Sequence, residues 1–125
     1  MSIKILGIPF RKIKSNQILS RVEKAFSLRE NIRIATVNPE FLLESVRNPH
    51  FRESLLRADI RTVDGVGVRM AAWLRGRNLY RVTGADLLRQ LLAFAENHAV
   101  PLTIYNQQRS LSAEGDIREA LGRLY

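Results

Sequence analysis

The sequence predicts an α/β protein with a Rossmann-like, mainly parallel sheet flanked by helices. Short β-branched runs alternate along the chain with segments of helical apolar spacing, and polar motifs stand where strands pass into helices. Apolar residues make up 46% of the 125 residues, which is typical of a globular protein. A chain of this length has room for one domain with a real core, so we expect a single α/β domain over residues 1–125.

Four short apolar runs are expected to form strands. They are Ile3–Ile8, Ile32–Val37, Ile60–Val63 and Leu102–Tyr105. Gly7 and Pro9 close the first run, and Asp64-Gly65 turns the chain after the third. The alternation of these runs with helical segments is what favours a parallel arrangement.

The helices are predicted from apolar spacing and from their capping residues. Asn16–Leu28 has helical spacing, Asn38-Pro39-Glu40 and Asn48-Pro49 each begin a helix, and Thr83-x-x-Asp86 resembles a capping box. Val66–Leu74 is apolar nearly all round, so we expect a largely buried helix with Met70 and Trp73 in the core. A last helix is marked by four apolar residues: Ile117, Ala120, Leu121 and Leu124.

Composition excludes several classes of function. The chain has no Cys, so disulfides, thiolate chemistry and a Cys-built zinc site are excluded. His50 and His98 lie in unrelated segments, and there is no Asp-x-Asp sequence, P-loop or G-x-G-x-x-G fingerprint, so we expect neither metal nor cofactor. No run approaches the roughly 18–20 apolar residues that span a bilayer. We therefore expect a cytoplasmic protein, either soluble or peripheral on the inner face of the membrane.

The net charge of +8 comes mostly from arginine, with 16 Arg against 4 Lys. The guanidinium fork suits phosphate, so polyanionic partners or simply a solvated basic surface both explain this balance. A nucleic-acid partner is not expected, because the chain has no dense basic stripe and no interleaved surface aromatics.

Three polar motifs identify the candidate site. They are ATVNPEFLLES at 35–45, TVDGVGV at 62–68 and RVTGADLL at 81–88. Each also has a structural interpretation: Asp64 caps the following helix or sets a turn, Thr36 bonds a neighbouring carbonyl, and Asn38 is an N-cap. Arg81 is interpreted in the same way as an exposed surface residue, and Gly65 as a tight-turn glycine.

In this order and at this spacing, the motifs resemble the TagA/WecG/CpsF family of bacterial glycosyltransferases, from about Ile3 to Ala99. The resemblance implies inverting transfer of N-acetylmannosamine, or a related hexosamine, from a UDP-sugar donor to a polyprenyl-diphosphate-linked N-acetylglucosamine. Such enzymes act in cell-surface polymer biosynthesis, including wall teichoic acid. By resemblance Asp64 is the catalytic base, and Thr36, Asn38, Gly65 and Arg81 bind substrate.

The sequence also departs from this family. Its members are usually longer, and they place a Gly-rich turn where this chain has Asn106–Ser110 without glycine. The chain stops at Tyr125 inside a helical pattern, so we expect the N-terminal portion of a larger domain. The alternative is a catalytically silent remnant that binds a lipid diphosphate or an anionic membrane. An incomplete sheet edge makes a homo-oligomer a further expectation.

Overall fold

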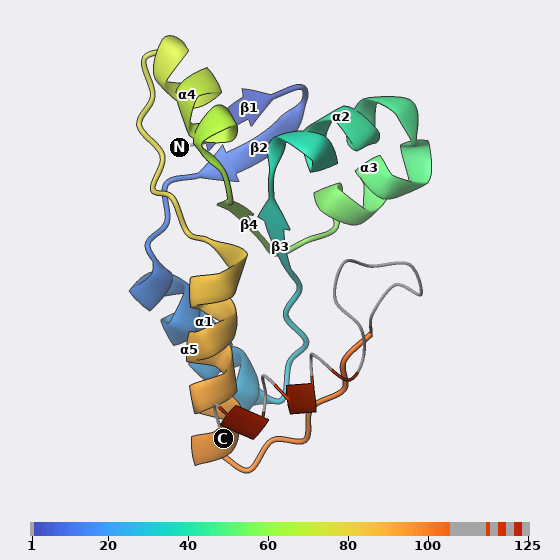
Figure 1. Ribbon diagram of the computed structural model, residues 1–125. Helices are drawn as coiled ribbons and strands as arrows, with labels where there is room; N and C mark the ends of the chain where they lie inside the picture. The colour runs from blue at the N-terminus through green and yellow to red at the C-terminus, as the bar shows by residue number, and fades with distance from the viewer. Residues whose placement is uncertain (1, 106–114, 116–117, 120–121, 124–125) are drawn as a thin grey trace. The chain divides into compact units, whose positions relative to one another are not determined.

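The computed structural model describes residues 2–105, 115, 118–119 and 122–123 (Figure 1). It divides into two compact units, Met1–Phe94 and Ala95–Tyr125. The strands and helices, in chain order, are β1 (Ser2–Ile5), β2 (Ile8–Arg11), α1 (Ser15–Leu28), β3 (Ile34–Val37), α2 (Pro39–Arg47), α3 (Pro49–Leu56), β4 (Ile60–Val63), α4 (Val66–Leu74) and α5 (Gly84–Asn97). The class is α/β, as predicted.

The first apolar run does not form one strand, and that prediction was wrong. Residues 2–11 form an antiparallel hairpin, in which Ile5 pairs with Ile8 across a two-residue turn. Leu6 and Gly7 both have positive φ, 49° and 79°, which is the geometry of the tight hairpin turns whose twist matches that of the strands. The expectation failed because Leu at the first turn position hides the reversal inside an apolar run.

The second sheet is the parallel pair β3–β4, with Ile34 opposite Ile60 and Val37 opposite Val63. Its two faces pack against different apolar clusters. Val37 and Val63 belong to the cluster formed with the hairpin, α2, α3 and α4. Ile34 and Ile60 belong to the cluster formed with α1, Val82 and α5. Side chains alternate along a strand, so Thr36 and Thr62 lie on the same face as Ile34 and Ile60, nearer the carboxyl ends of the two strands.

The predicted helix caps are confirmed. The Asn38 side chain accepts a hydrogen bond from the Phe41 backbone N at 2.9 Å, and Thr83 Oγ1 accepts from the Asp86 N at 3.1 Å. Asn48 likewise accepts from two amides at the start of α3. These caps satisfy amides that the first turn of a helix leaves without partners.

Helix α4 is not largely buried, which corrects the prediction for Val66–Leu74. Val68 and Ala72 are buried, but Met70 is 55% and Trp73 69% exposed, so neither is a core residue. The spacing explains the difference, because the side of α4 that packs inward carries the small residues Ala71 and Ala72 beside Val68. Its larger apolar side chains lie on the other side.

In the second unit, Leu102–Tyr105 is irregular and exposed rather than a strand, so that prediction was also wrong. Of the predicted last helix, Ile117, Ala120, Leu121 and Leu124 lie outside the described residues, while the backbone is helical at Gly115, Arg118, Glu119, Gly122 and Arg123.

No helix within the described part of the chain is long and apolar enough to cross a membrane.

Candidate functional site

Three segments that are far apart in the sequence meet at the carboxyl end of the β3–β4 pair. The Asp64 N donates to the Val37 carbonyl at 2.9 Å, which joins the ends of the two strands. The Val82 N donates to the Val63 carbonyl at 3.0 Å, and Val63 forms a parallel bridge with Arg81. The three sequence motifs are therefore neighbours in space, at the edge where α/β proteins place their sites.

Gly84, the first residue of α5, lies against two of the predicted site residues. Its backbone N donates to Asp64 Oδ2 at 3.0 Å. A Cβ atom at Gly84 would lie 3.2 Å from that oxygen and 3.3 Å from Thr36 Oγ1. The Asp64 carboxylate and the Thr36 hydroxyl thus converge on one point, and the helix approaches them closely because residue 84 has no side chain.

This geometry decides between the structural interpretations of Asp64. The N-cap of α4 is Gly65, and no side-chain cap bond is made there. The carboxylate points instead to the first turn of α5, where exposed amides and the helix dipole favour a negative charge. Asp64 is only half-buried, and Oδ1 receives no hydrogen bond from any residue that the structure describes. Among the described residues, the Gly84 amide thus holds one of the two carboxylate oxygens.

Asn38 and Gly65 each have a structural function at this edge. Asn38 uses Oδ1 as the N-cap of α2. Gly65 has φ +140°, and a Cβ there would lie 3.2 Å from Pro39 Cδ, while a Cβ at Gly67 would lie 3.0 Å from Pro39 Cγ. The two glycines let the start of α4 pack against Pro39, which places Asn38 beside the Asp64 turn. A role of Asn38 or Gly65 in binding substrate stays a prediction.

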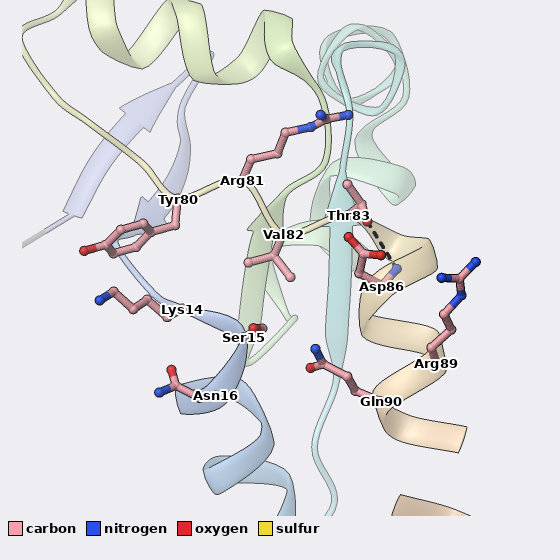
Figure 2. A pocket seen from close by; sticks show the side chains of 10 residues that line it. All are labelled: Lys14, Ser15, Asn16, Tyr80, Arg81, Val82, Thr83, Asp86, Arg89 and Gln90. Carbon is pink, nitrogen blue, oxygen red and sulfur yellow. Dashed lines mark hydrogen bonds between the residues drawn. The ribbon is translucent and has the colours of Figure 1, made fainter. Parts of the chain in front are cut away.

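Arg81 is exposed and lines a pocket of about 580 Å³ (Figure 2). The pocket lies between the start of α1, the segment before α5, and the first turns of α5. Figure 2 shows the Arg81 side chain extending away from Lys14, Asn16 and Gln90. The residues that line the pocket are Lys14, Ser15, Asn16, Tyr80, Arg81, Val82, Thr83, Asp86, Arg89 and Gln90.

Sequence reasoning missed the basic character of this pocket. The ammonium groups of Lys12 and Lys14 lie 5.0 and 5.1 Å from the centre of the Tyr80 ring, within the range of cation–π contact. Arg81 and Arg89 are also among the residues that line the pocket. The signal was present as Lys12-x-Lys14 just before α1, but nothing local linked that pair to Tyr80. The positive charge suits a phosphate-bearing ligand.

A metal centre finds no support in the described part of the chain. No group of three or more His, Cys, Asp or Glu side chains lies together there as ligands would.

The fold and site together define an α/β protein in which the Asp64 carboxylate lies at the ends of parallel strands, next to a basic pocket. The chain belongs to the Glycosyl transferase WecG/TagA/CpsF family, whose model matches residues 3–121. The resemblance seen in the three motifs is thereby confirmed.

A relative of known name is N-acetylglucosaminyldiphosphoundecaprenol N-acetyl-beta-D-mannosaminyltransferase from Bacillus spizizenii (strain ATCC 23059 / NRRL B-14472 / W23). It is 35% identical over 82 residues, which are 65% of this chain and 32% of the relative. The chain thus spans about a third of the length of the curated relative it matches.

Proposed function

We propose that this chain carries the catalytic base of an inverting glycosyltransferase. The donor is a UDP-linked N-acetylmannosamine or a related hexosamine, and the acceptor is a polyprenyl-diphosphate-linked N-acetylglucosamine. The observation that carries the proposal is the Asp64 carboxylate, held by the Gly84 amide beside Thr36 at the carboxyl ends of parallel strands. Family membership and the name of the Bacillus spizizenii relative support the choice of reaction and substrates.

In this mechanism the reaction is a single displacement. An acceptor hydroxyl attacks the anomeric carbon of the donor on the face opposite UDP, and a new C–O bond forms as the bond to UDP breaks. UDP leaves with the electron pair, and the hydroxyl proton passes to Asp64 Oδ1, the oxygen that is not bonded to Gly84. Inversion at the anomeric carbon follows from attack on the opposite face.

The neighbouring groups have supporting functions in the proposal. Arg81 stabilises the negative charge that grows on the diphosphate of UDP. The Thr36 hydroxyl and the Asn38 amide, which lie at the end of β3, bind sugar hydroxyls next to the base. The hydrogen bond from Gly84 fixes the orientation of the carboxylate, so that Oδ1 faces the acceptor.

The acceptor also decides where the reaction takes place. A polyprenyl chain is held in the bilayer, so we propose that the protein works at the cytoplasmic membrane face, in synthesis of a cell-surface polysaccharide. The diphosphate of such an acceptor carries the negative charge that the basic side chains around Tyr80 would attract.

The test is an Asp64→Asn variant, assayed by release of UDP from UDP-N-acetylmannosamine in the presence of a lipid-diphosphate N-acetylglucosamine acceptor. Loss of a general base lowers turnover by about 10²–10⁴-fold. Asn keeps the shape of the side chain and can still accept the Gly84 hydrogen bond, so the fold should be retained.

Asp59→Asn is the matched control. Asp59 stands at the other end of β4, and its Oδ2 also accepts a backbone hydrogen bond, from the Arg33 N at 2.7 Å. The control should keep normal turnover because it removes an equal charge far along the strand from the proposed base. Near-normal turnover of Asp64→Asn, or an equal loss in both variants, would refute the assignment of Asp64.

A further inference from the structure

Helix α4 exposes a continuous apolar face. Four large apolar side chains on it are more than half exposed, namely Val66 57%, Met70 55%, Trp73 69% and Leu74 74%. At about 100° per residue these positions fall within an arc of roughly 100°, on the side opposite the buried Val68 and Ala72. We name these four residues the α4 face. An apolar surface of this kind marks an interaction site.

The charge around the α4 face indicates what covers it. From Gly65 to Ala85 the chain contains no Asp or Glu, but it contains four arginines: Arg69, Arg75, Arg77 and Arg81. Arg69 is exposed and adjoins Trp73 on the helix surface, and Arg75 lies at the C-cap, where its Nη1 donates to the Lys4 carbonyl. An apolar stripe that ends on Trp73, with Arg69 next to it, is the composition of helices that lie in the interface of an anionic bilayer.

We infer that the α4 face docks on an anionic lipid surface, with Trp73, Met70 and Leu74 entering the boundary between headgroups and acyl chains and Arg69 beside them binding lipid phosphate. A second copy of the chain fits this surface less well. A twofold contact through α4 would set the positive segment 65–85 against itself, and like charges at close range oppose association. A bilayer supplies the opposite charge.

The experiment uses the fact that Trp73 is the single tryptophan of the chain, so that its fluorescence reports on the α4 face directly. The 125-residue protein is mixed with phosphatidylcholine vesicles, or with vesicles that also contain phosphatidylglycerol. The expected result is a blue shift of the emission with the anionic vesicles only, quenching by lipids brominated on their acyl chains, and weakening of both effects by salt.

Variants locate the contact. Met70→Ser with Leu74→Ser keeps the Trp73 reporter and removes two apolar side chains from the face, so the affinity for anionic vesicles should fall roughly tenfold or more. The matched control is Leu43→Ser with Val46→Ser on α2, where the side chains are similarly exposed, 53% and 62%, but stand beside Glu40 and Glu44. The control should bind as the unaltered chain does.

Three results would overturn the inference. One is an emission that does not change with anionic vesicles. Another is an emission that is blue-shifted without lipid and moves to the red on dilution of the protein, which would identify a second copy as the partner. The third is equal lipid binding by the α4 and α2 variants, which would place the contact elsewhere. None of these measurements depends on turnover, so they stand apart from the test of Asp64.

Discussion

Gly84→Ala is the substitution that tests most directly how the site is built. The added Cβ would lie 3.2 Å from Asp64 Oδ2 and 3.3 Å from Thr36 Oγ1, both below the 3.4 Å at which ordinary contact begins. Gly84 has no positive φ, so the backbone itself accepts alanine. The strain therefore falls on the two side chains, which must move by a few tenths of an ångström.

The magnitude follows from that displacement. A misplacement of 1 Å at a reacting group can cost about 10²-fold in rate, so roughly 0.3 Å corresponds to about a fourfold loss of kcat. Stability should change little, because Ala is favoured over Gly in a helix by about 0.5–1 kcal/mol, which offsets part of an overpacking cost of about 1–3 kcal/mol. The prediction is a kcat reduced about fourfold with a loss of at most about 2.5 kcal/mol in the free energy of unfolding.

The assay pairs UDP release under saturating donor and acceptor with denaturant unfolding of the same variant. Gly122→Ala is the control, because Gly122 is also in helical backbone and a Cβ there meets nothing within 4 Å. It should leave kcat unchanged. A Gly84→Ala chain with unaltered kcat would show that the contact with Asp64 and Thr36 does not set the position of the base, and the argument from convergence would fail.

Three further predictions concern the surrounding framework. Asn38→Ala and Asn48→Ala should each lower the free energy of unfolding by about 1 kcal/mol through loss of a cap, but only Asn38→Ala should also lower turnover. Arg61→Lys should cost about 1.5–3 kcal/mol in denaturant unfolding, because the Arg61 fork donates to carbonyls at Pro9 and at the end of α3. Thr62→Val should raise stability by about 1 kcal/mol, since the buried Thr62 Oγ1 has no hydrogen-bond partner among the described residues; an accompanying loss of turnover would show that this hydroxyl serves the site.

Elements that depend on local chemistry could be predicted from the sequence. Asn38, Asn48 and Thr83 each cap a helix because a short polar side chain stands directly before apolar residues of helical spacing. The parallel pairing of Ile34–Val37 with Ile60–Val63 was also predictable in kind, because each run is followed by a helix that must cross back over the sheet. The convergence of three motifs at one edge then follows from topology.

Elements that depend on distant contacts could not be predicted in the same way. The turn at Leu6–Gly7 needs two residues with positive φ, and Leu gives no local signal of that conformation. For α4, the apolar composition alone does not predict which side of the helix packs against the core. The hydrogen bond of Asp64 joins residues 20 positions apart in the sequence, and capping of the following helix by the Asp64 side chain was an equally good local explanation. Only the three-dimensional structure separates the two.

The α4 face and the proposed base are linked by the chain itself. Asp64 lies in the turn that precedes α4, which begins at Val66. Gly65 and Gly67 allow that turn to pack against Pro39. A helix that lies in the bilayer interface is buried by about 5–10 Å, at the boundary of headgroups and acyl chains. A carboxylate two residues before such a helix is therefore held near headgroup level, which is also the level of the diphosphate of a lipid-linked acceptor. Docking through α4 would thus set the height of Asp64 above the membrane. Weakening of this docking by Met70→Ser with Leu74→Ser should raise KM for a lipid-anchored acceptor more than KM for a water-soluble analogue.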